Sequence, residues 1–451
     1  MFKGKCFWLV LLFSSAGMFV LAGCANGEEA PEMATISTEP SPTPQAATEA
    51  ITPGVARITF TLQDFEEIEK SEIFLIGADG SGPSKLVEGE HSQLRCQSPD
   101  GSRIVYSSDE EVPNELFLYV AKADGSDATK VTEQPAELVW CLSEDSLIRV
   151  GRNGIAQTLI LHDLGSGQET TLLTDVVNWS ASPDGRRIAF VSGMDLTYDG
   201  SSLPAGNESL EVVDPDTGER RPLAGPQSGI SYFDFEWSPD GERIAYLVGP
   251  EEFRYSVSIN DSSDFDIYVR ALSSDEATLV HRVEGASAAN QPKFKWSPSG
   301  DWLLVVVESP QGPCTEEEQH EDLCKQEFEL ILVNVESGEA RQVVVSTEAL
   351  YFPEWAPNED SFAYATGEAV YLASADGEVR ELATATEGDC PFCLSAFGWS
   401  PDGRYIGLVR ETSYSASLQP IIAVLDTTTG EVRTIFERQG DLIFIWPQWW
   451  R

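Results

Sequence analysis

The pentapeptide Trp237-Ser238-Pro239-Asp240-Gly241 decides the fold, because the chain repeats it from one end to the other. Near-copies occur at residues 98–101, 182–185, 296–300 and 399–403, and two weaker copies occur at residues 140–142 and 355–358. A phrase that recurs every several dozen residues indicates an array of one supersecondary unit. The sequence therefore predicts a repeat fold.

Each copy of the phrase lies between two short apolar segments rich in β-branched and aromatic residues, such as residues 232–237 and 243–247. These segments predict strands, and Pro-Asp-Gly between them predicts a tight turn, because proline fixes φ and glycine accepts a positive φ. A third strand, a turn of Asp-Gly or Ser-Gly type and a fourth strand follow. Four antiparallel strands in roughly 40–50 residues make one blade of a β-propeller.

The number of blades follows from the residues aligned with the serine of the phrase, which are Ser98, Cys141, Ser182, Ser238, Ser297, Ala356 and Ser400. They predict seven internal blades. Three strand-like segments (residues 57–62, 71–76 and 84–87) precede the first phrase, and one first-strand segment (residues 444–449) ends the chain. We expect an all-β propeller of eight four-stranded blades, in which the C-terminal strand completes the N-terminal blade and leaves no free edge. A seven-bladed ring is the alternative.

Three repeats carry insertions between their second and third strands, at residues 195–207, 251–264 and 310–326. Loops that connect equivalent strands of successive blades lie at the same rim of a propeller, so we expect the three insertions on one face. Loops on a rigid framework commonly carry recognition. The insertions are therefore the predicted location of function.

The Trp-Ser-Pro-Asp-Gly phrase followed by an apolar strand resembles the repeat of TolB-type, WD-repeat-like β-propellers, and the resemblance covers nearly all of residues 55–451. Families with such repeats include periplasmic scaffolds, peptidase lids and lyases, so the resemblance implies the fold and little about activity. Equivalent tryptophans occur in four repeats, and we expect them to pack between blades: Trp237, Trp296, Trp355 and Trp399. A row of tryptophans that stacks on sugars is the alternative.

The N-terminal segment predicts export. Lys3 and Lys5 precede an apolar stretch too short to span a membrane, and the stretch ends in Leu21-Ala22-Gly23-Cys24, which resembles a bacterial lipobox. We expect a signal peptide at residues 1–23, lipidation of Cys24, a Pro/Ser/Thr/Glu-rich tether at residues 24–55 and the propeller at residues 56–451. The lipid would attach the protein to the outer face of the cell membrane. An ordinary signal peptide with a chance cysteine is the alternative.

The formal charge of −45 argues against nucleic acid as a partner. It suits a cationic partner, Ca²⁺ or simply a solvated acidic surface. The densest group of candidate oxygen ligands for Ca²⁺ is Asp261, Asp264 and Asp266, although their spacing does not match an EF-hand. Asx-turn chemistry in a polar loop is the alternative reading of these aspartates.

Six cysteines remain when Cys6 and Cys24 are set aside, an even number that suits disulfides in an exported chain. We expect Cys314 and Cys324 to close the polar insertion that contains them. We also expect a local disulfide between Cys390 and Cys393, because no second Cys-x-x-Cys or nearby histidine supplies a metal site. Finally, Cys96 and Cys141 occupy nearby positions in successive repeats, which predicts that they are bonded or close together.

No catalytic residue can be named from the sequence. The chain lacks the Gly-x-Ser-x-Gly pentapeptide of hydrolase domains that accompany propeller lids, and its histidines share no metal-ligand spacing: His91, His162, His281 and His320. We therefore expect a monomeric binding or scaffold module for a protein or polysaccharide partner, with the lipid as its only membrane contact. The alternative is an enzyme that acts on an exported polymer with carboxylates of the central channel as acid and base.

Overall fold

The computed structural model describes residues 54–64, 70–87, 91–109, 116–132, 138–153, 156–176, 178–193, 207–254, 261–311, 326–366, 369–384, 395–410, 421–437 and 443–450. These residues form strands β1 to β32 and one short 3₁₀ helix, η1 (Glu251–Phe253). Within these ranges, no helix has the length and apolar character needed to cross a membrane.

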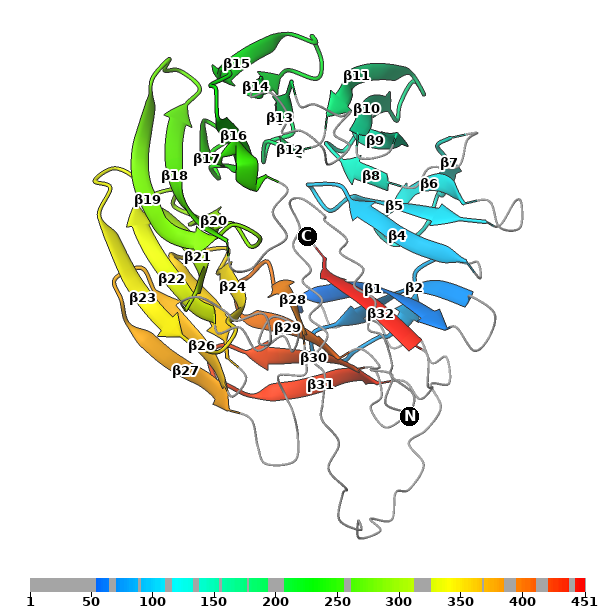
Figure 1. Ribbon diagram of the computed structural model, residues 1–451. Coiled ribbons are helices and arrows are strands. Elements are labelled where there is room, and N and C mark those ends of the chain that lie inside the picture. Colours follow the sequence, from blue (N-terminus) through cyan, green and yellow to red (C-terminus); the bar gives the residue numbers. More distant parts are fainter. Residues whose placement is uncertain are drawn as a thin grey trace, which may run out of the picture.

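The strands form eight four-stranded antiparallel sheets, which stand as blades around a central axis (Figure 1). The strands of each blade are given from the innermost outward. Blade 1 consists of β32 (Ile443–Trp449), β1 (Arg57–Asp64), β2 (Lys70–Gly77) and β3 (Ser84–Lys85), and blade 2 of β4 (Ser92–Gln97), β5 (Arg103–Ser108), β6 (Phe117–Lys122) and β7 (Thr129–Lys130). Blade 3 consists of β8 (Leu138–Cys141), β9 (Ser146–Asn153), β10 (Ala156–Asp163) and β11 (Glu169–Val176), and blade 4 of β12 (Trp179–Ala181), β13 (Ile188–Ser192), β14 (Ser209–Val213) and β15 (Arg220–Ala224).

In the same order, blade 5 consists of β16 (Ile230–Trp237), β17 (Arg243–Pro250), β18 (Ser262–Ala271) and β19 (Ala277–Ser287), and blade 6 of β20 (Lys293–Trp296), β21 (Trp302–Pro310), β22 (Gln326–Asn334) and β23 (Ala340–Ser346). Blade 7 consists of β24 (Tyr351–Trp355), β25 (Ser361–Ala365), β26 (Ala369–Ser374) and β27 (Val379–Thr384), and blade 8 of β28 (Ser395–Trp399), β29 (Tyr405–Arg410), β30 (Ile421–Asp426) and β31 (Val432–Glu437). The predicted all-β propeller with eight four-stranded blades is confirmed.

The ring closes through the two ends of the chain, as predicted. Strand β32 pairs with β1 in an antiparallel register that runs from Ile58 opposite Trp449 to Asp64 opposite Ile443. The Trp450 backbone N–H extends the ladder by donating to the Arg57 carbonyl oxygen at 2.7 Å. The C-terminal strand is therefore the innermost strand of the blade that the N-terminal strands begin.

The repeated phrase forms the turn between the first two strands of a blade. The Gly241 N–H donates to the Ser238 carbonyl oxygen at 2.9 Å, and Gly241 has a φ of 68°, which favours glycine. The Ser238 hydroxyl donates to the Asp240 carboxylate and accepts from the Arg243 N–H at 2.9 Å. Serine, aspartate and glycine thus recur because each satisfies one requirement of the same turn.

The structure corrects the alignment of the second repeat. Strand β8 ends at Cys141, and the Leu142 N–H donates to the Ser146 carbonyl oxygen at 3.0 Å. The Ser238 N–H makes the equivalent bond to the Arg243 carbonyl oxygen at 2.9 Å. Leu142 is therefore the counterpart of Ser238, and Cys141 is the counterpart of Trp237.

The predicted packing of tryptophans between blades is confirmed. In five blades, the last residue of the innermost strand is a tryptophan that is 6–9% exposed. Its indole N–H donates to a backbone carbonyl oxygen on the innermost strand of the preceding blade, whose inner edge has no strand partner. We call this contact the indole bridge. The bridges run from Trp237 to Ser180 (3.1 Å), Trp296 to Glu236 (3.1 Å), Trp355 to Lys295 (3.1 Å), Trp399 to Glu354 (3.1 Å) and Trp449 to Gly398 (2.8 Å).

Blades 2, 3 and 4 have Gln97, Cys141 and Ala181 at the position of that tryptophan. The Gln97 side-chain amide donates to Thr59 Oγ1 of blade 1 at 3.0 Å. In blade 4, Trp179 lies two residues earlier in the strand, and it donates to the Gln157 side chain of blade 3 at 2.9 Å. Other contacts therefore replace the indole bridge in this arc of the ring.

A separate apolar core lies at each of the eight junctions between neighbouring blades. The largest joins blades 5 and 6 and includes Phe265, Phe294 and Trp296. The smallest joins blades 2 and 3, where the fully buried side chains among the described residues are Val105, Leu118 and Leu147. Most of the hydrophobic stabilisation of the ring thus lies between blades, and it is weakest at the junction of blades 2 and 3.

Candidate functional site

Side chains on the innermost strands alternate between the cores and the axis of the ring. In β20, Phe294 and Trp296 are buried in the core between blades 5 and 6, whereas Lys293 is exposed and Lys295 is half-buried. Lys293 reaches back to blade 5 and Lys295 reaches forward to blade 7. Both lysines therefore lie on the wall that faces the axis.

Charged side chains gather on this wall in blades 5, 6 and 7. Lys293 Nζ lies 3.3 Å from Asp234 Oδ2, and Lys295 Nζ lies 2.6 Å from Glu354 Oε2. Glu236, two residues after Asp234 in β16, is a third carboxyl group, and it interacts with Lys295. We call the set Asp234, Glu236, Lys293, Lys295 and Glu354 the charged sector.

The carboxyl group of Glu236 is unusual within the charged sector. Burial raises the pKa of Glu236 to about 8, because the Asp234 and Glu354 carboxylates add to the effect of burial and Lys295 only partly opposes it. Burial alone lowers the pKa of Lys295, but the Glu354 and Glu236 carboxylates outweigh it and the pKa is raised. At neutral pH the charged sector thus holds two ion pairs and one protonated carboxyl group, which can donate a hydrogen bond.

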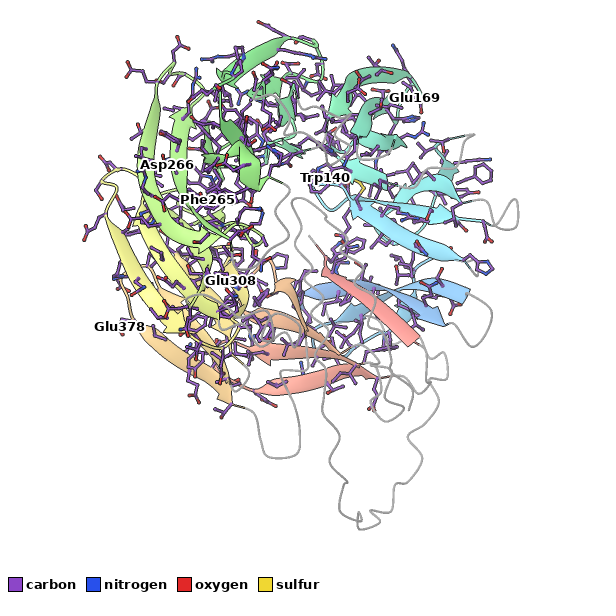
Figure 2. The ribbon with its side chains drawn as sticks, in the orientation of Figure 1. Trp140, Glu169, Phe265, Asp266, Glu308 and Glu378 are labelled. Atoms are coloured by element: carbon purple, nitrogen blue, oxygen red, sulfur yellow. A yellow bond between two sulfur atoms is a disulfide. The ribbon has the colours of Figure 1, made fainter. Side chains whose placement is uncertain are left out.

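The other blades present uncharged residues at the matching position, which is the residue just before the last one of the innermost strand. These residues are Gly398, Gln448, Cys96, Trp140 and Ser180. Trp140 is half-buried at the inner end of β8 (Figure 2), with its ring 6.1 Å from that of Trp179 in an edge-on arrangement. At this position the ring is therefore asymmetric, with charges on three adjacent blades; elsewhere on the innermost strands, Arg95 of β4 donates to the Ser107 hydroxyl at 2.9 Å.

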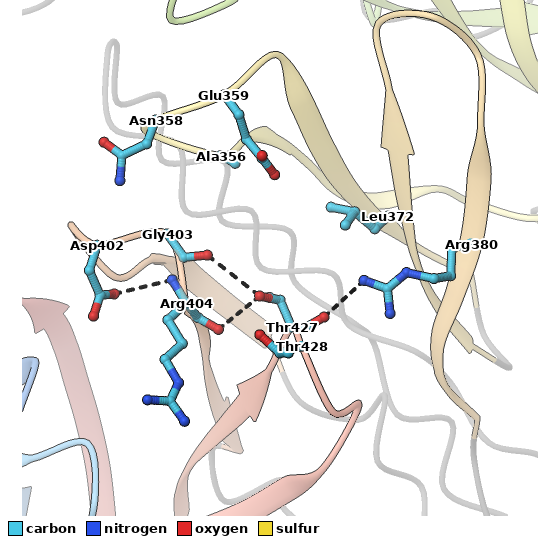
Figure 3. A pocket seen from close by; sticks show the side chains of 10 residues that line it. All are labelled: Ala356, Asn358, Glu359, Leu372, Arg380, Asp402, Gly403, Arg404, Thr427 and Thr428. Carbon is cyan, nitrogen blue, oxygen red and sulfur yellow. Dashed lines mark hydrogen bonds between the residues drawn. The ribbon is translucent and has the colours of Figure 1, made fainter.

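A pocket of about 490 Å³ lies elsewhere, between the turns of blades 7 and 8 (Figure 3). Its polar groups already bond to one another: Arg380 donates to the Thr427 carbonyl oxygen at 2.9 Å, and the Thr427 hydroxyl donates to the Arg404 carbonyl oxygen at 2.9 Å. The Arg404 guanidinium pairs with Asp426 at 3.1 Å. These bonds hold the two blades together.

The predicted calcium ligands are engaged in other contacts. Asp266 accepts two hydrogen bonds from Arg282, at 2.7 and 2.8 Å, and Asp264 accepts one from the Gly285 N–H at 3.0 Å. No cluster of three His, Cys, Asp or Glu side chains suited to a metal ion occurs among the described residues, so Asp261 does not join the other two aspartates as a ligand set. An arginine that is distant in the sequence takes the place that a cation would have. Calcium binding stays a prediction without support in the described ranges.

The histidines lie apart from the charged sector. His91 pairs with Asp109 at 2.9 Å, and His162, which is buried, contacts Glu169 at 3.1 Å on the outer strands of blade 3. Burial lowers the pKa of His281, on the outermost strand of blade 5. His320 lies outside the described residues.

The cysteines divide into two groups. Cys96 on β4 and Cys141 on β8 are adjacent, with their Cα atoms 5.8 Å apart and their sulfur atoms joined. Lipidation of Cys24 and the pairings of Cys314 with Cys324 and of Cys390 with Cys393 lie outside the described residues and stay predictions.

The insertions connect second and third strands, as predicted, and most of their residues also lie outside the described ranges. The start of one insertion is described: Arg254 follows η1, forms an ion pair with the buried Glu208 and donates to the Tyr232 carbonyl oxygen at 2.6 Å. This ion pair fixes the base of the insertion of blade 5 against blade 4.

Sequence reasoning missed the charged sector, although a signal was present. Glu236, Lys295 and Glu354 each directly precede a tryptophan at the end of a first strand. An alignment of the repeats on that tryptophan, with attention to the residue before it, would have found the charges.

Comparisons with known proteins support the fold. No family model matches the sequence, and no curated protein matches it. Among solved structures, dipeptidyl peptidase 4 of Porphyromonas gingivalis is similar with a TM-score of 0.51 and 13% identity over 81% of this chain and 56% of that chain. An oligogalacturonate lyase in complex with manganese has a TM-score of 0.46 and 15% identity, over 82% of this chain and 97% of the lyase. TolB from Acinetobacter baumannii has a TM-score of 0.34 and 14% identity, over 77% of this chain and 83% of TolB. At 13% identity, the likeness to the peptidase shows a shared fold and nothing finer.

Proposed function

We propose that the protein is an exported, lipid-anchored β-propeller that binds a polar protein or polysaccharide ligand through the charged sector. The observation that carries the proposal is the asymmetry of the axial wall, where three adjacent innermost strands supply Asp234, Glu236, Lys293, Lys295 and Glu354. Ion pairs that only stabilised the ring would have no reason to concentrate on one arc. Rigid strands with charged and hydrogen-bonding groups held at fixed positions suit recognition.

The two ion pairs favour a ligand that carries charges of both signs or many hydroxyl groups. Lys295 is 40% exposed and Glu354 36% exposed, so a ligand can reach both groups without breaking the fold. The protonated Glu236 adds a hydrogen-bond donor beside them. A strongly anionic ligand is disfavoured, because the chain carries a formal charge of −45.

The test is affinity capture from the native membrane after mild crosslinking, followed by measurement of binding to the captured partner. Glu236→Ala and Lys295→Ala should each weaken binding about tenfold or more, because each removes a polar group of the charged sector. Glu378→Ala is the matched control, since Glu378 is exposed on the outer side of the ring (Figure 2). Equal binding by the two sector variants and the control would reject the charged sector as the binding site.

Anchoring is tested separately. Lipid labelling and membrane association should both be lost in Cys24→Ser, while the propeller remains folded. Labelling that persists in this variant would remove the lipoprotein from the proposal.

A second candidate function is supported by one observation, the raised pKa of Glu236 next to the Lys295–Glu354 pair. A carboxyl group that keeps its proton at neutral pH can act as a general acid in the cleavage of an exported polymer. The test is turnover of polysaccharide and peptide libraries by the purified protein. Activity that disappears in Glu236→Gln and persists in Glu378→Gln would favour the enzyme over the binding module.

A further inference from the structure

The junction between blades 2 and 3 is the one place in the described ring where a pair of cysteines joins two innermost strands. Cys96 lies on β4 and Cys141 on β8, and their Cα atoms are 5.8 Å apart. Figure 2 shows this sulfur–sulfur bond beside Trp140, at the inner ends of the two blades. The bond therefore lies on the axial side of the ring, where the indole bridges also lie.

The two cysteines occupy the same two positions that an indole bridge joins elsewhere. Cys141 is the last residue of its innermost strand, as Trp296 is in β20. Cys96 is the residue before the last one in its strand, as Glu236, which accepts the bond from Trp296, is in β16. The sulfur–sulfur bond thus connects the position of the donor in one blade to the position of the acceptor in the blade before it.

This junction also has the least apolar material. Val105, Leu118 and Leu147 are its fully buried residues among those described, whereas the next smallest core, between blades 6 and 7, has seven such residues. Cys96 and Cys141 themselves are partly buried against that small core. Because this junction has neither an indole bridge nor a large core, its stability depends more on a covalent bond that spans it.

We propose that the Cys96–Cys141 disulfide is a covalent replacement for the indole bridge. It stabilises the junction of blades 2 and 3 only in an oxidising compartment, where the disulfide forms. In a reducing compartment the two thiols leave the junction with its small core and one exposed ion pair, between Arg103 of blade 2 and Asp145 of blade 3 at 3.5 Å. After export, the thiols pass two electrons and two protons to an external disulfide, which becomes two thiols as the Cys96–Cys141 bond forms. The claim that the bond forms after export rests on the proposed location of the protein. The mechanical role, which is that the bond stabilises the junction of blades 2 and 3, does not depend on that location.

Hydrogen exchange measured by mass spectrometry tests the mechanical role. In Cys96→Ser/Cys141→Ser, amides of β4, β5, β8 and β9 should exchange at least tenfold faster than in the wild type, while amides of β20, β21, β24 and β25 stay within twofold. Cys314→Ser/Cys324→Ser is the matched control, since it also removes two cysteines and leaves Cys96 and Cys141 unchanged. A serine variant that exchanges like the wild type would overturn the proposal, and so would equal acceleration all around the ring, which would indicate general destabilisation.

A rescue variant provides a second, independent readout. In Cys96→Ser/Cys141→Trp, an indole stands at the donor position of blade 3, and exchange of β4 and β8 should be slower than in the double serine variant. If the tryptophan does not fit and the variant does not fold, the double serine variant decides the question alone. Thiol labelling of the purified wild type checks the premise, because Cys96 and Cys141 that react freely without reductant would contradict the bond.

Discussion

The ring consists of two arcs that meet the same requirement with different chemistry. In blades 5, 6, 7, 8 and 1, an indole bridge joins each innermost strand to the one before it. In blades 2, 3 and 4, a glutamine, a pair of cysteines and a displaced tryptophan make the connection instead. The difference shows that each of these innermost strands is bonded to the preceding blade, and that a tryptophan indole is one of several groups that make the bond.

The arcs also differ at the axis. The charged sector lies entirely in blades 5 to 7, within the arc that has indole bridges. Because the indoles fix the backbone carbonyl groups of Glu236, Lys295 and Glu354, they hold the strands that carry the charged side chains. Rigidity and charge therefore coincide on one side of the ring.

The largest loss of stability is expected when the ring cannot close, because both arcs are parts of the closed ring. Truncation before Ile443 deletes β32 and leaves Ile58, Phe60 and Leu62 of β1 without their innermost partner strand. We expect a fall of more than 10 °C in the melting temperature or loss of soluble protein, measured by calorimetry. Trp449→Phe is the control that keeps β32 and loses only the indole bridge. An unchanged melting temperature after truncation would show that β32 does not close the ring.

The next effect separates the two arcs directly. Trp296→Ala should cost about 3–5 kcal/mol of unfolding free energy, because it empties part of the core between blades 5 and 6. Trp296→Phe keeps most of the apolar contact and should cost about 1 kcal/mol, the contribution of the hydrogen bond to the Glu236 carbonyl oxygen. Gln97→Ala in blade 2 should cost about as much as Trp296→Phe. Urea denaturation measures all three, and equal losses for Trp296→Ala and Trp296→Phe would contradict the assignment of the core contribution.

The third effect, which is spread over several pH units, concerns pH and the charged sector. Because the pKa of Glu236 in the folded protein is about 8, above its ordinary value of 4.5, the folded state holds a proton that the unfolded state releases. The stability contributed by this group is therefore fully present below about pH 4.5 and is lost as the pH rises toward 8. Each pH unit within that window should cost at most about 1.4 kcal/mol.

Glu236→Gln should remove this slope and make the protein more stable than the wild type at pH 8, with no difference at low pH. Denaturation at several pH values measures the slope, and Glu378→Gln should follow the wild type. Parallel pH profiles for wild type and Glu236→Gln would contradict a protonated Glu236.

The fold was predictable because the information repeats. Seven copies of one phrase and a matching pair of chain ends predict the number of blades and the closure by β32, and the recurring tryptophans predict the packing between blades. The proximity of Cys96 to Cys141 was predictable for the same reason, since neighbouring repeats place equivalent residues side by side.

The candidate site was harder to predict because it depends on differences between repeats. Glu236 and Lys295 stand at equivalent positions, but neither residue is part of the repeated phrase. The prediction of a calcium site lacks support for a related reason. Asp266 pairs with Arg282 on the next strand, and a local pattern of aspartates in the sequence does not show this partner. Composition alone does not show which charges are already paired.

The pairing of β1 with β32 has a consequence for the time course of folding. Ile58 and Trp449, which are opposite each other in the finished ring, belong to the first and the last strands that the structure describes. Seven blades can form from consecutive stretches of chain, but the eighth must wait until the final strand has emerged from the ribosome. Contacts so distant in sequence form slowly. Until β32 is made, the ring is therefore an open arc in which one blade is incomplete.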